Sequence, residues 1–126
     1  MSDLLLLKQR VAVCRLAADE AVPAWVKGDE LTVITRTPEE LSMVCDERWV
    51  PVHIRAENGW RILKVQGPLD FNQVGVLSAI AIPLAQAGVS IFAISTFDTD
   101  FILVKESALT QAMNALQDAG HKVDAE

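Results

Sequence analysis

The stretch GPLDFNQVGVLSAIAIPLAQAGVSIFAISTFDTDFILVK, residues 67–105, decides the fold of this chain. Its first part, residues 71–87, repeats apolar side chains three or four positions apart, at Val74, Leu77, Ile80 and Leu84. That spacing places them on one face of a helix and predicts a helix over residues 71–87. Asp70 precedes this helix, and Gln73 stands three positions later. At that spacing a side-chain oxygen of Asp70 can cap free backbone N–H groups while the Gln73 amide reaches back to Asp70.

A β-hairpin is predicted directly after this helix. Gly88 is a residue at which a helix can end, because a residue without Cβ adopts a left-handed turn at little cost. Residues 89–96 are then β-branched and aromatic, and residues 101–105 repeat that character after a short polar break at Asp98 and Thr99. Two such runs with so short a break favour an antiparallel hairpin.

The remaining elements of the second half complete a known arrangement. Residues 60–66 are predicted to form a strand, residues 107–119 an amphipathic helix capped by Ser107 and ended by Gly120, and residues 121–125 a last strand. The order strand, helix, strand, strand, helix, strand is the split β-α-β pattern. The fold class is therefore α+β, a ferredoxin-like module with an antiparallel sheet and both helices on one face.

The first half resembles a degenerate copy of the same plan. Strands are expected at residues 8–17, 31–36, 42–45 and 49–55, with turns at residues 46–48 and 57–59, and a loop at residues 18–30 in which Pro23 and Gly28 prevent a long helix. Thr37, Pro38 and Glu40 form a helix-start signal, from which we expect about one helical turn. The predicted domains are a degenerate module at residues 1–58 and a complete module at residues 59–126.

Composition excludes several classes of partner. The chain has 126 residues, 51% of them apolar, and a net charge of -6 without a basic cluster, which argues against nucleic acid and anionic membranes. Residues 72–97 carry no charge, but Pro83, Gln86 and Gly88 interrupt them, so a membrane span is not expected. The four leucines at residues 4–7 are too few for a signal peptide, and a cytoplasmic protein is predicted.

The residues most often used for metals and redox chemistry are isolated in this sequence. Cys14 and Cys45 lie in separate apolar segments, which favours two reduced core residues. His53 and His121 have no second ligand nearby, and each is expected on a strand surface. No metal and no cofactor is predicted.

Gly75 is the first candidate for a functional residue. In the first turn of the predicted helix it leaves backbone N–H groups uncovered at the positive end of the helix dipole, where a carboxylate or another small anion binds well. A glycine there can equally serve close packing. The sequence leaves both interpretations open.

The motif G-x-L-x-x-I-A-x-P-L-A-x-A-G-V-S-I at residues 75–91 resembles the signature of the ACT domain, a small regulatory module usually controlled by amino acids. The segments STFDTDFILV at residues 95–104, TRTPEELS at 35–42 and GPLDF at 67–71 resemble the tandem ACT proteins of the CASTOR type. The likeness extends over nearly the whole chain, from about residue 11 to residue 123.

This resemblance implies a small-molecule ligand, most naturally an amino acid, bound where elements of two modules meet. In the CASTOR sensors the ligand is arginine, which is one candidate here, although no acid besides Asp70 stands near the helix start. The implied ligand-binding residues are Gly75, Val76, Leu77, Thr96, Phe97, Asp100, Thr35, Arg36 and Thr37.

The charged residues Asp98, Asp100 and Arg36, which lie in or near the implied site, also have ordinary structural interpretations. For Asp98 we favour a role in closing the turn, since Asp bonds readily to nearby backbone. For Asp100, at the edge of the turn, we favour ligand binding through a charge-assisted hydrogen bond. Arg36 can either contact ligand or form a surface pair with Glu39 or Glu40.

The sequence therefore predicts a non-catalytic amino-acid sensor without catalytic residues, working as a homodimer and read by an unidentified protein partner. The alternative is a structural or interaction module that dimerises or docks a partner without binding a ligand. An enzyme is not expected, because no nucleophile stands beside a base and no phosphate-binding glycine motif is present.

Overall fold

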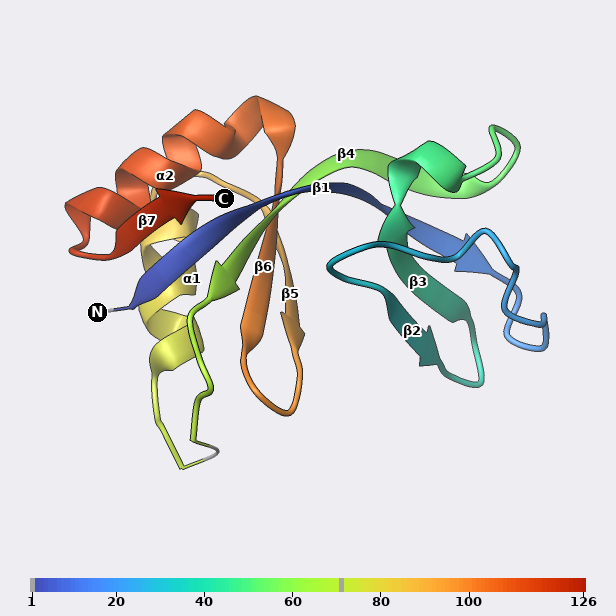
Figure 1. The fold of residues 1–126 in the computed structure, drawn as a ribbon, viewed down its shortest axis with the longest axis horizontal. Coiled ribbons are helices and arrows are strands. Elements are labelled where there is room, and N and C mark those ends of the chain that lie inside the picture. Colours follow the sequence, from blue (N-terminus) through green and yellow to red (C-terminus); the bar gives the residue numbers. More distant parts are fainter. Residues whose placement is uncertain (1, 71) are drawn as a thin grey trace. The chain divides into compact units, whose positions relative to one another are not determined.

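The structure, a computed structural model, describes residues 2–70 and 72–126. The elements follow one another along the chain as β1 (Asp3–Leu16), β2 (Val33–Arg36), β3 (Leu41–Asp46), η1 (Glu47–Trp49), β4 (Arg55–Val65), α1 (Val76–Gln86), β5 (Ile91–Ser95), β6 (Asp100–Lys105), η2 (Glu106–Ala108), α2 (Leu109–Asp118) and β7 (Lys122–Ala125). They form two compact units (Figure 1). The N-terminal unit is Gln9–Trp60, and the C-terminal unit joins the residues up to Lys8 to Arg61–Glu126.

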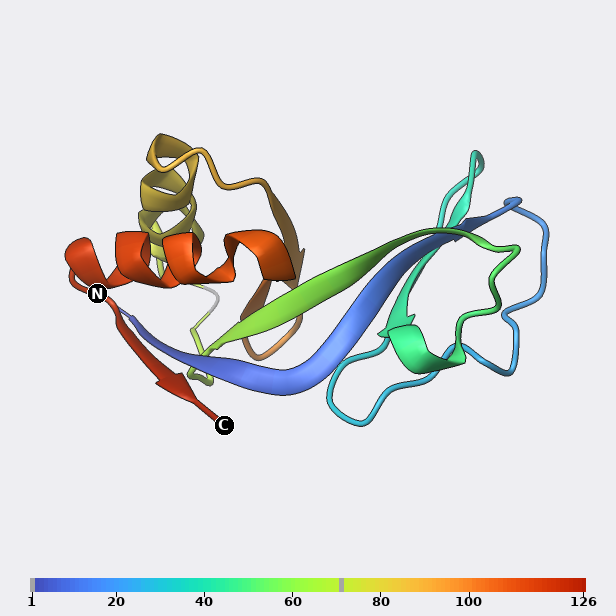
Figure 2. The same cartoon turned by 90° about the horizontal axis from the view of Figure 1, so that it is seen from above.

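The C-terminal unit has the predicted α+β, ferredoxin-like organisation. Its strand order is β7-β1-β4-β6-β5, and α1 and α2 cover the same face of the sheet (Figure 2). The predicted hairpin is confirmed, since β5 and β6 pair antiparallel from Ile91 opposite Val104 to Ser95 opposite Asp100. Buried side chains of the strands and both helices form one core, which includes Leu63, Ile80, Leu84, Ile102 and Leu116.

An additional strand enters this sheet from the start of the chain. β1 begins at Asp3, so the predicted start at residue 8 was too late. Its first residues pair in parallel with β7, from Asp3 opposite Lys122 to Leu6 opposite Ala125. Leu4 is fully buried in the core beside the helices. The sequence could not show this strand position, because the pairing partner lies at the other end of the chain.

Helix α1 begins later than predicted. Gly75 is its N-cap with φ of 83°, so a helix starting at residue 71 is wrong; Phe71 itself lies outside the described residues. The expected reciprocal bonds do exist, as Asp70 N–H donates to Gln73 Oε1 at 2.8 Å and Asn72 N–H to Asp70 Oδ1 at 3.1 Å. They close a separate turn before the helix. Val74 is accordingly fully exposed rather than part of the apolar stripe.

Both helices end with the same backbone motif at a glycine. In α1, Gly88 N–H donates to Ala85 O and Val89 N–H to Leu84 O, and in α2 the bonds are Gly120 N–H to Gln117 O and His121 N–H to Leu116 O. This is the Schellman motif, and both glycines have positive φ. The predicted cap at Ser107 is wrong, because Ser107 lies in η2 and α2 starts after Ala108 without a side-chain cap.

The N-terminal unit has no α-helix among its described residues. Its strands are ordered β2-β3-β1, with β1 and β3 antiparallel from Val11 opposite Asp46 to Leu16 opposite Leu41. The predicted loop at residues 18–30 is confirmed. It is fastened by the Arg36 guanidinium, which donates to Ala18 O and Glu20 O, and by the buried Gln9 amide.

Several local predictions for this unit were wrong. The Thr37 signal forms a hairpin turn instead of a helical turn: Thr37 Oγ1 accepts the N–H groups of Glu39 and Glu40 at 3.2 Å each. Residues 49–55 do not form a strand, because Pro51 and the following turn interrupt them, and residues 57–59 lie inside β4. Gly59 continues that strand with φ of 79°. Glycine adopts a positive φ both in turns and in bulged strands, so the Glu-Asn-Gly sequence is compatible with either structure.

The burial of the isolated cysteines and histidines confirms one prediction and contradicts another. Cys14 and Cys45 are buried as predicted, and the pKa of the Cys45 thiol is raised by its hydrogen bond with Cys14 and by burial. His53 is exposed in a turn, not on a strand. His121 is only 5% exposed, so its expected position on a strand surface is also wrong. Among the described residues, no helix is both long and apolar enough to cross a membrane.

Candidate functional site

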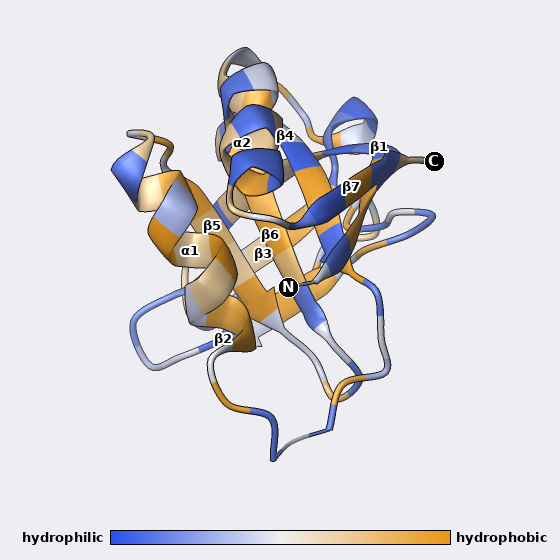
Figure 3. Cartoon of the chain, turned by 90° about the vertical axis from the view of Figure 1, so that its left-hand side faces the viewer, coloured by the Kyte–Doolittle hydropathy of each residue, from blue (hydrophilic) through white to orange (hydrophobic). Residues whose placement is uncertain are grey.

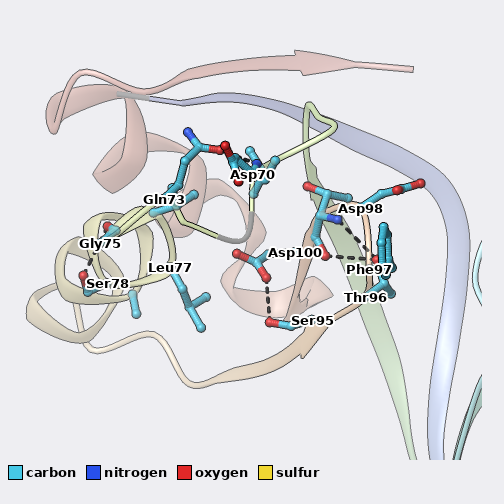
Figure 4. Close-up of a pocket in the computed structure, with 14 residues that line it drawn as sticks. Asp70, Gln73, Gly75, Leu77, Ser78, Ser95, Thr96, Phe97, Asp98 and Asp100 are labelled. Atoms are coloured by element: carbon cyan, nitrogen blue, oxygen red, sulfur yellow. Dashed lines mark hydrogen bonds between the residues drawn. The ribbon is translucent and has the colours of Figure 1, made fainter.

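A cavity of about 640 Å³ lies in the C-terminal unit between the start of α1 and the turn that joins β5 to β6 (Figure 4). The preceding loop contributes Leu69, Asp70 and Gln73. Helix α1 contributes its N-cap Gly75 and first two turns, and the hairpin contributes all residues from Ser95 to Asp100. The cavity therefore joins two of the three segments in which the sequence placed its candidates.

The start of α1 offers backbone donors without a side-chain cap. Gly75 makes no capping hydrogen bond, and its carbonyl begins the helix by accepting Ala79 N–H at 2.9 Å. A Cβ atom at Gly75 would meet only Ser78 Oγ, at the ordinary distance of 3.7 Å. The interpretation of this glycine as a close-packing residue is therefore wrong. Its φ of 83° explains the glycine, since that conformation is costly for other residues.

The hairpin turn that forms the opposite wall is held by hydrogen bonds of its threonines. Thr96 N–H donates to Thr99 O at 2.8 Å, and Thr99 N–H to Thr96 Oγ1 at 3.3 Å. The buried Thr99 hydroxyl donates to Val65 O at 2.7 Å. Asp98 O accepts Leu69 N–H at 2.6 Å, which ties the turn to the loop before α1. These bonds use the Thr96 hydroxyl and not the Asp98 carboxylate, so the expected turn-closing role of the Asp98 side chain is wrong.

Asp100 directs its carboxylate from the hairpin toward α1 (Figure 4). One of its oxygens, Oδ1, accepts a hydrogen bond of 2.6 Å from the Ser95 hydroxyl across the hairpin. This bond fixes the side chain while Oδ2 stays available for a donor in the cavity. Phe97 and Asp98 extend to the other side of the same turn, and Phe97 is 79% exposed.

The cavity has a strongly acidic lining. Three of its residues are aspartates, Asp70, Asp98 and Asp100, whereas none of its described lining residues is Lys, Arg or His. Gln73 lines the cavity with a neutral amide, whereas the hydroxyls of Ser78, Thr96 and Thr99 donate to backbone carbonyls of the protein. Such a lining favours a cation, while the uncapped helix start at the same cavity favours a small anion. A molecule carrying both charges satisfies both walls.

The structure brings six of the nine predicted ligand-binding residues to this cavity: Gly75, Val76, Leu77, Thr96, Phe97 and Asp100. Thr35, Arg36 and Thr37 belong to the N-terminal unit and are not among its lining residues. There the Arg36 guanidinium binds backbone carbonyls and Thr37 closes a turn. A ligand contact by these three residues remains a prediction.

Eight further lining residues were absent from the predicted site: Leu69, Asp70, Gln73, Ser78, Ala81, Ser95, Asp98 and Thr99. Ser78 stands three positions after Gly75 and Ala81 four positions after Leu77, so a helical projection from Gly75 identifies them. Asp70 reaches the cavity because its turn with Gln73 closes before α1, whereas the sequence spacing predicted that turn as the start of the helix. Among the described residues, no group of His, Cys, Asp and Glu is arranged to hold a metal ion.

Family models match both parts of this chain. A family model for the ACT domain matches residues 55–118, and a second model, for an N-terminal domain, matches residues 9–53. The human protein named cytosolic arginine sensor for mTORC1 subunit 1 is 41% identical over 59 residues, which are 46% of this chain and 18% of the human protein. The chain thus aligns with less than a fifth of that relative.

Solved structures extend the similarity to both units. A crystal structure of a protein from Agrobacterium tumefaciens has a TM-score of 0.93 at 38% identity, covering 99% of this chain and 93% of that one. The regulatory subunit of aspartate kinase from Thermus thermophilus shares the fold, with a TM-score of 0.61 at 11% identity over 89% of this chain and 93% of that chain. With the family model matching half of the residues, the chain belongs to the ACT domain family.

Proposed function

We propose that this protein is a non-catalytic sensor that binds a free amino acid in the cavity between α1 and the β5–β6 turn. The observation that carries the proposal is the position of the uncapped α1 start and the Asp100 carboxylate at one cavity. The α-carboxylate of the ligand accepts the N–H groups at Val76 and Leu77, and its ammonium group donates to Asp100 Oδ2. The name of the human relative, an arginine sensor of the cytosol, supports a regulatory and cytoplasmic role.

The lining further selects among amino acids. One carboxylate neutralises the α-ammonium group, which leaves Asp70 without a compensating cation among the described lining residues. A basic side chain supplies that charge, and an acidic side chain would add to the repulsion. We therefore propose that the site prefers arginine, lysine or ornithine to neutral amino acids, and rejects aspartate and glutamate.

Thermal unfolding of the pure protein with each amino acid in turn tests this function. A ligand present at 100 times its dissociation constant adds about 2.7 kcal/mol to the free energy of unfolding. Asp100→Asn is expected to abolish the shift produced by a basic amino acid, and Asp118→Asn, an exposed change on α2, is the matched control. If no amino acid stabilises the wild-type protein, the sensor function is refuted.

A second candidate function, dimerisation, is favoured by the outer face of α1. Ala79, Ile82 and Ala85 are exposed on this helix, with Ile82 55% exposed, whereas the exposed face of α2 is polar (Figure 3). Strand β5, which ends the strand order of the C-terminal unit, also lacks charged residues. The partner that we propose for this surface is a second copy of the chain, because two uncharged surfaces meet without the repulsion expected from a net charge of -6.

Light scattering after size-exclusion chromatography tests the dimer separately from ligand binding. Ile82→Lys is expected to convert the dimer to a monomer, because the introduced charge would be buried between two copies. Gln117→Lys places the same side chain on the exposed face of α2 and should leave the dimer intact. A wild-type protein that is monomeric at all concentrations refutes this candidate.

A further inference from the structure

His121 occupies a position where the fold elsewhere uses an apolar residue. The Schellman motif that ends α1 puts Val89 immediately after its glycine, and the same motif at the end of α2 puts His121 there. Both side chains are buried, with 6% of Val89 and 5% of His121 exposed. An apolar contact at this place is the usual companion of the motif. A titratable ring at the second copy therefore needs an explanation other than packing.

The hydrogen bonds of the His121 ring explain why a titratable residue stands at this position. His121 Nε2 lies 2.8 Å from Ala79 O, and His121 Nδ1 accepts Ser2 N–H at 3.1 Å. The carbonyl of Ala79 would ordinarily accept the N–H of the residue four positions later in α1, but that residue is Pro83, which has no N–H. Nε2–H of His121 donates to this freed carbonyl. The ring thus replaces a backbone bond that the sequence of α1 cannot make.

These two bonds define one charge state. Ala79 O needs a donor at Nε2, and Ser2 N–H needs an acceptor at Nδ1, so the neutral ring with its proton on Nε2 satisfies both. A proton on Nδ1 would face the Ser2 N–H donor and leave it unsatisfied in a part-buried place, which is costly. The charged residues closest in sequence to the ring or to its partner Ser2 are Asp3 on β1, Asp118 on α2, and Lys122 and Asp124 on β7, all exposed; α1 has none. Lys122 and Asp124 pair with each other at 3.7 Å.

Both partners of His121 adjoin the candidate ligand site. Ser2 and Ala79 line a second cavity of about 480 Å³, which shares Leu69, Gln73, Gly75 and Val76 with the first. Ala79 also closes the first turn of α1, since its N–H donates to Gly75 O. The ring thus fixes the turn whose N–H groups face the ligand.

We propose that His121 is a positioning residue for the ligand site, and that its protonation loosens the first turn of α1 and weakens ligand binding. This inference rests on the proposed amino-acid site. Because histidine changes charge between about pH 5 and 8, the site binds its ligand more tightly at pH 7.5 than at pH 5.5. The sign follows from the bonds: a proton added at Nδ1 faces the Ser2 N–H and pushes the charged ring away from Ser2. That shift also draws Nε2–H away from Ala79 O, so the turn is held best while the ring is neutral.

The test measures the dissociation constant of L-arginine at pH 5.5 and 7.5. Wild-type protein is expected to bind about tenfold more weakly at pH 5.5, the effect of one unsatisfied donor in a part-buried place. The chain has two histidines, so His53→Asn, which changes the exposed one, should keep this difference. His121→Asn keeps a polar group near Ser2 but cannot titrate. The dissociation constant of this variant for L-arginine should differ less than twofold between pH 5.5 and pH 7.5. Each protein retains residues before Ser2, verified by mass spectrometry, so that the donor stays a peptide N–H.

A readout without ligand separates this inference from the proposed function. Amide spectra of the free wild-type protein are recorded through the same pH range together with the two imidazole signals. The amides of residues 75–79 should move with the titration of His121 and not with that of His53. If L-arginine does not bind but these amides follow His121, the positioning role holds and the ligand proposal fails. The inference is overturned if the amide signals of residues 75–79 do not change with the titration of His121. It is also overturned if His121→Asn keeps the tenfold difference in affinity between pH 5.5 and pH 7.5.

Discussion

The two units of this protein cover their sheets in different ways. In the C-terminal unit, α1 and α2 pack on the sheet through an apolar core, and their ends leave a cavity beside the hairpin turn. In the N-terminal unit, loop residues including Trp25 and Val26 pack on the buried cluster of β1 and β3, and polar side chains fasten the loop. The contrast teaches that two helices packed on the strands leave a cavity where a helix start lies beside a hairpin turn, whereas a loop packs on the strands of the N-terminal unit.

The core beneath the helices gives the largest expected effect. Leu84→Ala should lower the free energy of unfolding by about 3 kcal/mol, because Leu84 is fully buried between α1 and the sheet. Hydrogen exchange should show the loss of protection in the C-terminal unit. Met43→Ala, an equally buried change in β3, should cost a similar amount with the loss centred on the N-terminal unit. If both variants lose protection everywhere, the units unfold as one and the comparison between them fails.

The fastening of the loop by Gln9 comes next. Its amide accepts Glu30 N–H and Leu31 N–H at 2.8 Å each and donates to Leu31 O at 3.0 Å. Gln9→Ala should destabilise the protein by about 2 kcal/mol, because buried backbone groups lose their partners. Urea unfolding measures the cost. Gln117→Ala on the exposed face of α2 should cost about 0.5 kcal/mol or less, and equal costs for the two changes would contradict a special role of the buried amide.

Asp46 gives a smaller effect that depends on pH. Hydrogen bonds from the Arg48 side chain lower the pKa of this buried carboxyl against the opposing effect of burial. Since the pKa is lower in the folded protein, the pair stabilises the fold above the unfolded pKa near 4, and this stability is lost as the pH falls through the folded value. Asp46→Asn should therefore cost about 1 kcal/mol at pH 7 and less at pH 3, measured by urea unfolding.

Asp29→Asn is the control for that experiment. Asp29 lies 3.8 Å from the same arginine but is 89% exposed. Its removal should change stability little at either pH, because an exposed pair is screened by water. A cost for Asp46→Asn that does not shrink at pH 3 would show that the carboxylate charge is not what stabilises this turn.

Arg36 gives the smallest expected effect and distinguishes its two possible roles. Arg36→Gln should cost about 0.5 kcal/mol, since the donors of this exposed side chain hold the carbonyls of Ala18 and Glu20. Hydrogen exchange should become faster in residues 18–22 only, and the affinity for a basic amino acid should change less than twofold. A larger loss of affinity would instead support the ligand contact predicted from the family resemblance.

Local signals in the sequence predicted most of the C-terminal unit. The glycine after each helix, the polar break between β5 and β6 and the period of the apolar residues act over a few positions, so they can be read without the fold. The same signals misled where two structures share one pattern. Thr37 forms the hydrogen bonds of a helix cap in a hairpin turn, and Asp70 with Gln73 forms them in a turn that ends before the helix.

The sequence by itself determined the fold class, the hairpin and the end of each helix, because each depends on spacing along the chain. Its resemblance to the ACT family pointed to six residues that line the cavity. Only the tertiary structure decided that β1 enters the sheet beside β7, that Asp70 and Asp98 join Asp100 at one cavity, and that His121 serves the carbonyl freed by Pro83. Each of these depends on residues that are distant in sequence or on the path of an irregular loop, and pairing across such distances is set by the packing of the whole unit.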